Sequence, residues 1–216
     1  MKNIQDYELI IFDCDGVLLN SNLIKSEAFK HSTNEYGAKI SDHFVEYHKR
    51  NGGISRYRKF QYFIEKILEK DFDQDLYNKL LQNFSDFLKK ELVSCEIAED
   101  LYKLKKITKK SKWMVASGGD QDELRDVFSQ RGIYDYFEYG IHGSPKTKET
   151  IFRDEITKLR KDSVIFLGDS KYDYLVAKKF GIDFIFLSKW TEFIEWESYC
   201  DTNVIRHFPE LKCLIS

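Results

Sequence analysis

The chain contains 216 residues, of which 42% are hydrophobic and 32% charged, and its formal net charge is -2. This length suits one large domain or a core with a smaller appended unit, and the balanced charge gives no reason to expect nucleic acid or an anionic membrane as a partner. No apolar run approaches the roughly 18 residues that cross a bilayer. The four cysteines lack CxxC spacing, so we expect reduced thiols in a cytoplasmic protein. We expect this protein to be a monomer or a weak dimer.

The first predicted element is a strand, because four apolar residues, LIIF (9–12), come directly before two aspartates, Asp13 and Asp15. A short apolar run of this kind is typical of a strand buried on both faces of a parallel sheet. A buried carboxylate is unfavourable unless something pairs with it. The pattern therefore predicts that the rest of the chain supplies a partner for these two side chains.

The next region, 19–91, shows helical spacing and contains no convincing strand. Apolar side chains recur three and four residues apart in YRKFQYFIEKIL (57–68) and in DQDLYNKLLQNFSDFLKKEL (73–92), which is the pattern of an amphipathic helix. A glycine pair in RNGGISR (50–56) predicts a loop between helices. We expect an all-helical unit inserted after the first strand.

Beyond this region the sequence alternates between short apolar runs and amphipathic stretches. The expected strands cover 113–117, 163–168 and 183–187, with a weaker one at 136–142. The expected helices cover 120–132, 147–160 and 170–181. Strands and helices that alternate at this pitch predict an α/β fold with a doubly wound parallel sheet. We assign 1–18 and 92–216 to this core and 19–91 to the helical insertion.

Polar residues follow the predicted strands at their carboxyl ends, where ligands bind in an open parallel sheet. They are Asp13, Asp15, Ser117, Gly118, Lys146, Lys148, Asp169 and Asp173. Four carboxylates at one edge need a cation, and Mg2+ takes oxygen ligands together with a phosphate oxygen. Hydroxyl, amide and lysine donors suit the remaining phosphate oxygens. An aspartate in such a site is a candidate nucleophile, and a second one a candidate acid and base.

These residues resemble the motifs of the haloacid dehalogenase superfamily of phosphatases. FDCDGVLLNS (12–21) resembles the first motif, with Asn20 where aspartate is more usual, VASGG (115–119) resembles the second, and GDSKYD (168–173) resembles the fourth. The resemblance implies a Rossmann-like core with an inserted all-helical cap. The cap looks like the small C1 cap of the subfamily that includes phosphoglycolate phosphatase and beta-phosphoglucomutase.

The third motif of the superfamily is a single lysine ahead of a helix, for which the chain offers Lys146 and Lys148. We favour Lys148, because Thr147 can cap the helix and so places Lys148 in the first turn, near the positive helix end where a phosphate would bind. The resemblance implies that Ser117 and the Gly118 amide hold the phosphoryl group together with this lysine.

The resemblance also implies a role for each carboxylate. Asp13 is the nucleophile and a magnesium ligand, and Asp15 is the general acid and base, with its backbone carbonyl on the metal. Asp169 is a direct metal ligand, while Asp173 orients metal-bound water or the lysine.

The expected function is Mg2+-dependent hydrolysis of a small phosphomonoester, a sugar or sugar-acid phosphate, through an aspartyl-phosphate intermediate. Arg56, in the predicted cap loop, is a further candidate for holding a substrate anion.

A sugar phosphomutase of the beta-phosphoglucomutase type stays an alternative, because it uses the same core and a similar cap. A non-catalytic sugar-phosphate binding module would predict at least one lost carboxylate, and none is lost. A dehalogenase would not need Asp15.

Overall fold

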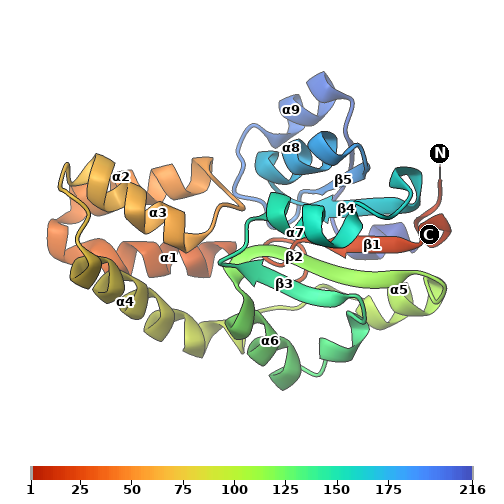
Figure 1. The fold of residues 1–216 in the computed structure, drawn as a ribbon, viewed down its shortest axis with the longest axis horizontal. Helices are drawn as coiled ribbons and strands as arrows, with labels where there is room; N and C mark the ends of the chain where they lie inside the picture. The colour runs from red at the N-terminus through yellow and green to blue at the C-terminus, as the bar shows by residue number, and fades with distance from the viewer. Residues whose placement is uncertain (1, 216) are drawn as a thin grey trace.

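The computed structural model describes residues 2–215, the side chain of residue 90 excepted. Within this part of the chain six strands form one sheet with parallel neighbours in the order β3-β2-β1-β4-β5-β6. The strands are β1 (Leu9–Phe12), β2 (Lys112–Asp120), β3 (Gly140–Ser144), β4 (Val164–Gly168), β5 (Asp183–Leu187) and β6 (Arg206–Phe208). The first strand therefore lies inside the sheet, between β2 and β4 (Figure 1).

Both faces of the sheet are covered, because its inner strands are apolar on both sides. In β1, Ile10 and Phe12 belong to one hydrophobic cluster, and Leu9 and Ile11 belong to another, as side chains that alternate across a strand must. The helices after the insertion are α5 (Leu101–Ile107), α6 (Gln121–Gln130), α7 (Lys148–Ile156), α8 (Lys171–Phe180) and α9 (Trp196–Asn203). Side chains of α5 and α6 join the first cluster, and those of α7 and α8 join the second. The predicted α/β fold with a doubly wound parallel sheet is confirmed.

Two predicted strand boundaries were wrong. The strand expected at 136–142 begins only at Gly140, because Tyr134–Tyr136 form a 3-10 turn and the ring of Phe137 lies in the core, 5.8 Å from that of Phe12. The strand expected at 113–117 continues to Asp120, with a register shift against β3 after Ala116. The serine and glycines of the second motif therefore lie within the irregular end of β2, rather than in a loop beyond it.

Between β1 and α5 the chain forms four α-helices, which lie together at the left of Figure 1. They are α1 (Asn22–Thr33), α2 (Ala38–Arg50), α3 (Arg56–Tyr62), which a π-helical turn (Phe63–Ile67) continues, and α4 (Gln74–Leu92). Phenylalanines form their interior: the ring centroid of Phe29 lies 4.4 Å from that of Phe84 and 5.3 Å from that of Phe60. The helices and the loop between α2 and α3 agree with the expected helical insertion, while its division from the core as a separate domain stays a prediction.

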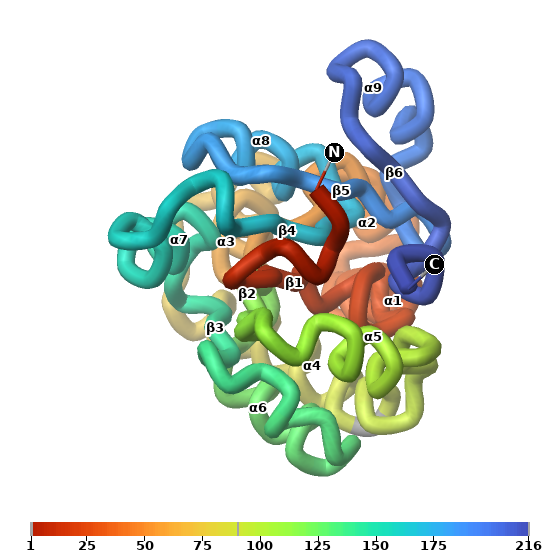
Figure 2. The backbone as a smooth tube through the Cα atoms, turned by 90° about the vertical axis from the view of Figure 1, so that its right-hand side faces the viewer, coloured from red at the N-terminus to blue at the C-terminus, as the bar shows by residue number. Residues whose placement is uncertain are grey.

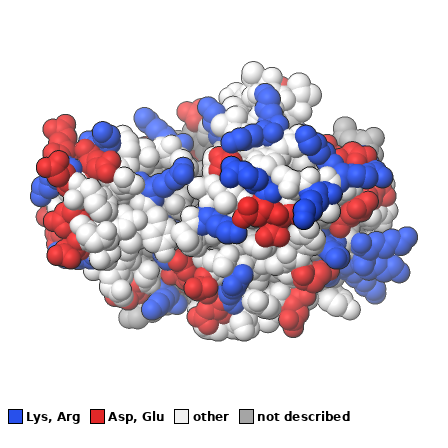
Figure 3. Space-filling model, in the orientation of Figure 1, with Lys and Arg blue, Asp and Glu red and all other residues white. Residues whose placement is uncertain are grey.

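The strands run with their carboxyl ends toward the four inserted helices, and both ends of the chain lie at the opposite end of the molecule (Figures 1 and 2). Side chains after β1, β2, β3 and β4 thus face the helical insertion. None of the helices in the described part is long and apolar enough to cross a bilayer. On the face shown in Figure 3, basic and acidic side chains are interspersed, which agrees with the small net charge.

We predict that Asp73→Ala lowers the free energy of unfolding by about 1 kcal/mol, the usual effect of losing an N-cap. The Asp73 carboxylate accepts hydrogen bonds from the amides of Asp75 (2.9 Å) and Leu76 (3.1 Å), which lie in the first turn of α4. Urea unfolding followed by circular dichroism measures the change. Asp71→Ala is the control, because it removes the same charge from an exposed residue outside the cap; equal effects of the two variants would contradict the capping role.

Candidate active site

Asp13 and Asp15 are placed by a tight turn at the end of β1. The amide of Asp13 still donates to the carbonyl of Leu167 in β4 (2.9 Å), so Asp13 continues the sheet and its side chain is only 2% exposed. The amides of Leu18 and Leu19 then donate to the carbonyl of Cys14, which turns the chain back. The turn presents Asp15 above the sheet edge.

Gly16 explains why a glycine follows the two aspartates. Its φ is +74°, a conformation that residues with a side chain rarely adopt. A Cβ at this position would lie 2.0 Å from Oδ2 of Asp169 and 2.5 Å from Nδ2 of Asn22. The turn can approach Asp169 this closely only without a side chain.

Lys148 is the partner that the buried aspartates require. It is the first residue of α7, 1% exposed, and its Nζ lies 2.8 Å from Oδ2 of Asp13 and 2.5 Å from Oδ1 of Asp173. Burial alone would lower the pKa of Lys148, but the charges of Asp13 and Asp173 raise it above its ordinary value. Thr147 caps α7 by accepting the amide of Thr150 (3.2 Å), as the sequence predicted.

Lys146, the alternative lysine, points away from this cluster. Its Nζ pairs with Oδ2 of Asp154 at 2.6 Å, and about half of its side chain is exposed. The structure thus brings Lys148 to the predicted carboxylates and leaves Lys146 in a surface ion pair.

Asp13, Asp169 and Asp173 form a compact group of buried carboxylates at the carboxyl edge of the sheet. One oxygen from each lies within 4.8 Å of the others. Asn22 Nδ2 donates to Asp169 (2.8 Å), and the amide (3.1 Å) and hydroxyl (2.7 Å) of Ser170 donate to Asp173. Asp169 is therefore held by α1, and Asp173 is held by the N-cap of its own helix, α8.

This group fits a divalent cation. Burial raises the pKa of Asp13 to about 7 despite the charge of Lys148, and burial together with the charges of Asp13 and Asp173 raises the pKa of Asp169 well above its ordinary value. The three carboxylates, when ionised, carry more negative charge than the single ammonium of Lys148 can neutralise. An all-oxygen donor set suits a hard cation such as Mg2+.

Asp15 lies apart from these three carboxylates and is held by different donors. Ser21 Oγ donates to its Oδ1 at 2.6 Å, and Lys25 Nζ lies 2.5 Å from its Oδ2. Burial would raise the pKa of Asp15, but the charge and hydrogen bond of Lys25 and the hydroxyl of Ser21 outweigh it and lower the pKa. This environment favours the ionised form of Asp15, whose side chain pairs with Lys25.

Ser117 and Gly118 lie at the end of β2, as the second motif predicts. Ser117 is fully buried, and its Oγ accepts a hydrogen bond from the amide of Gly119 (3.0 Å). Gly118 touches the loop between α2 and α3, since a Cβ there would lie 2.4 Å from the carbonyl oxygen of Gly53. A side chain at residue 118 would push this loop away from the sheet.

Arg56, the predicted anion-binding residue, connects the inserted helices to the core. Its guanidinium lies 3.1 Å from Glu123 and 3.7 Å from Asp120, and Tyr57 donates to Asp120 at 2.6 Å. Arg56 lines the pocket, but its charge is already balanced by these two carboxylates.

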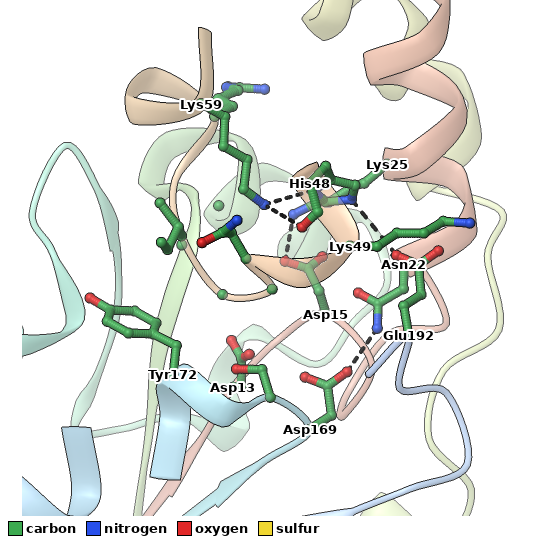
Figure 4. Close-up of a pocket in the computed structure, with 18 of the residues that line it drawn as sticks. Asp13, Asp15, Asn22, Lys25, His48, Lys49, Lys59, Asp169, Tyr172 and Glu192 are labelled. Carbon is green, nitrogen blue, oxygen red and sulfur yellow. Dashed lines mark hydrogen bonds and ion pairs between the residues drawn. The ribbon is translucent and has the colours of Figure 1, made fainter. Parts of the chain in front are cut away.

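A pocket of about 330 Å³ lies between the carboxylates and the inserted helices (Figure 4). Sequence reasoning missed several polar residues that line it: Asn22, Lys25, His48, Lys49, Lys59, Tyr172 and Glu192. Asn22 and Lys25 were detectable, because they lie three residues apart on a helix that begins directly after the first motif. His48 and Lys59 carried no such signal, because they come from separate helices that meet only in the folded protein.

This architecture defines an α/β enzyme whose site combines an aspartate at the end of the first strand with two acidic residues after β4 and a buried lysine. The family model for haloacid dehalogenase-like hydrolases matches residues 10–187, and the chain belongs to this family. The predicted family and enzyme class, a hydrolase of the haloacid dehalogenase-like type, are confirmed.

Individual relatives are similar over most of the chain. A phosphorylated carbohydrates phosphatase from Thermotoga maritima is 24% identical over an alignment of 189 residues, and the match covers 83% of this chain and 84% of the relative. A predicted phosphatase from Clostridium acetobutylicum shares the fold with a TM-score of 0.74 at 18% identity, covering 97% of this chain and 96% of that one. A hydrolase of this family from Bacillus subtilis, solved bound to magnesium, has a TM-score of 0.67 at 14% identity and covers 99% and 97%.

We predict that Lys148→Ala reduces kcat/KM far more than Lys146→Ala, by an amount equivalent to about 2–4 kcal/mol of transition-state stabilisation, as for loss of a preorganised donor. Lys148 is buried against Asp13, whereas Lys146 pairs with Asp154 at the surface. Steady-state kinetics of the two variants at saturating Mg2+ measures the difference, and thermal unfolding checks that both are folded. A crippled Lys146→Ala beside a near-normal Lys148→Ala would reverse the assignment.

Proposed function

We propose that this chain is a divalent-metal-dependent phosphatase that hydrolyses a small phosphomonoester, a phosphorylated carbohydrate or sugar acid. The observation that carries the proposal is the buried group of Asp13, Asp169 and Asp173 with Lys148 inside it, at the carboxyl edge of the sheet. The phosphatase from Thermotoga maritima that acts on phosphorylated carbohydrates supports the substrate class. The magnesium-bound relative from Bacillus subtilis supports Mg2+ as the metal.

Asp13 is the proposed nucleophile. Its carboxylate attacks phosphorus, the bond from phosphorus to the substrate oxygen breaks, and an aspartyl phosphate forms. Asp13, Asp169 and the backbone carbonyl of Asp15 would hold the metal, and Asp173 would orient water on the metal or Lys148; when bound, the metal neutralises charge on the phosphoryl oxygens. Lys148, the Ser117 hydroxyl and the amide of Gly118 are the proposed donors to these oxygens.

Asp15 is the proposed acid and base. It delivers a proton to the leaving oxygen, and as a carboxylate it then takes a proton from the water that attacks the aspartyl phosphate. Its lowered pKa favours the carboxylate, the form needed for the second step. For the first step Asp15 must gain a proton from solvent, because the pKa of Lys25, which is hydrogen-bonded to Asp15 at 2.5 Å, is raised by this carboxylate and the lysine keeps its own proton.

The inserted helices, 19–91, are proposed to act as the cap that selects the substrate. Their side chains line the same pocket as Asp13 and Asp15, so a substrate bound for attack would contact both parts. A pocket of about 330 Å³ suits a small metabolite rather than a macromolecule. The complete set of carboxylates supports catalysis over a non-catalytic binding module.

We expect phosphatase activity to require a divalent cation, because three buried carboxylates share one lysine and Asp13 must be ionised to attack. Treatment with EDTA followed by dialysis should abolish hydrolysis of p-nitrophenyl phosphate, and added Mg2+ should restore it. Sodium chloride at matched ionic strength is the control. Undiminished turnover by the metal-free protein would refute the metal-dependent mechanism.

Asp13→Asn is expected to lower kcat by about a thousandfold or more, since it removes the nucleophile while keeping the shape of the side chain. Asp154→Asn is the matched control, because Asp154 is an acidic residue at the surface whose carboxylate pairs with Lys146. The measurement is kcat at saturating substrate and Mg2+, with circular dichroism to verify folding. If Asp13→Asn kept a tenth of the wild-type kcat, another group would be the nucleophile.

A further inference from the structure

A buried lysine and a buried histidine face each other on the side of the pocket formed by the inserted helices (Figure 4). Lys59 of α3 is 2% exposed, and its Nζ lies 2.6 Å from Nδ1 of His48 in α2. Both residues line the same pocket as Asp13 and Asp15. A substrate whose phosphate group reacts at Asp13 would therefore place its opposite end against this pair.

Lys59 lacks the counter-charge that three other cations of the site have. Lys25 pairs with Asp15, Arg56 with Glu123, and Lys148 with Asp13. Among the described residues, no carboxylate lies within 4.0 Å of Lys59 Nζ, whose hydrogen-bond partners are Nδ1 and the carbonyl (3.5 Å) of His48.

An unpaired ammonium in this position is unfavourable by itself. The ring of Phe29, 5.4 Å from Nζ, offers a cation–π contact but no net negative charge. Burial lowers the pKa of Lys59 to about 7. An anion entering the pocket would supply the charge that the folded chain does not.

His48 adds a second unsatisfied donor. Burial lowers its pKa well below the ordinary value, so the ring is neutral. When Lys59 is protonated its ammonium can only donate to Nδ1, which places the ring proton on Nε2, and Nε2 is buried without a hydrogen-bond partner among the described residues. The nearby oxygen of Glu192 is 3.7 Å away, and both oxygens of that carboxylate accept from Ser26 Oγ.

The charges on this side of the pocket favour an anion. Lys49 also lines it, and Lys25 is balanced by Asp15. On the side of the pocket next to α2 and α3, the cationic residues Lys49, Arg50, Arg56 and Lys59 outnumber the carboxylates of Asp120, Glu123 and Glu192. The site thus has an excess of positive charge at one end and, at the other, the carboxylates proposed to hold the metal.

We propose that Lys59, positioned by His48, binds a second anionic group of the substrate, a carboxylate or a second phosphate, at the end away from the phosphoryl group that is removed. This rests on the proposed phosphatase function and narrows its substrate class to phosphomonoesters with two anionic ends. Lys59 donates to the distal anion, and His48 Nε2 is a further donor beside it.

Binding to the Asp13→Asn variant tests the proposal without relying on turnover. Calorimetry compares two pairs of ligands in the presence of Mg2+: phosphoserine with phosphoethanolamine, which differ by a carboxylate, and glucose bisphosphate with glucose monophosphate, which differ by a phosphate. We expect at least one doubly anionic member to bind about tenfold or more tightly than its partner, as for a charged hydrogen bond. The pair that shows the preference identifies the distal group.

Lys59→Met in the same background should remove that preference, because it keeps the length of the side chain but not the charge. Lys59→Gln also removes the charge but keeps a hydrogen-bond donor for His48, so it replaces Lys59→Met if the methionine variant does not fold. Lys66→Met is the control, since Lys66 is exposed in the turn that continues α3. Equal affinities within both pairs, or a preference that survives in the Lys59 variants, would overturn the proposal. Absence of turnover in the wild type beside intact selective binding would instead refute the phosphatase function.

Discussion

The interaction on which the site depends is the ammonium of Lys148 between the carboxylates of Asp13 and Asp173. The three residues come from α7, from the end of β1 and from α8, and none is more than 2% exposed. Removing Lys148 would leave two buried carboxylates without a cation, which is far less favourable than the intact arrangement. The lysine permits two carboxylates to be buried side by side, and a third, Asp169, leaves the group short of positive charge and suited to a cation.

The close approach of backbone segments builds the rest of the site around this cluster. Gly16 lets the turn after β1 lie against Asp169, and Gly118 lets the loop between α2 and α3 lie against the end of β2. Arg56 and Glu123 join the inserted helices to α6 at the same border. Small residues and one ion pair thus bring the helical insertion over the carboxylates and enclose the pocket.

The pocket has two chemically different ends. The sheet end carries Asp13, Asp15 and Asp169, and the helical end carries Lys59, His48 and Lys49. An active site that places a reactive centre on the core and a recognition surface on the insertion allows the same reaction to be directed to different substrates. In the proposed phosphatase, the sheet end determines the chemistry and the helical end determines which phosphomonoester is accepted.

The sequence by itself determined the parallel doubly wound sheet, the helical insertion and the positions of Asp13, Asp169 and Lys148. Each follows from local patterns: apolar runs that end in carboxylates, helical periodicity and a capped helix. Packing and pairing with distant segments decided three further features: the irregular end of β2, the 3-10 turn before β3 and the short strand β6. The partners of Arg56 and Lys146, and the meeting of His48 with Lys59, were decided only by tertiary structure. The range of a charge or a hydrogen bond is a few ångströms in space, and residues from separate helices reach that range only once the chain is folded.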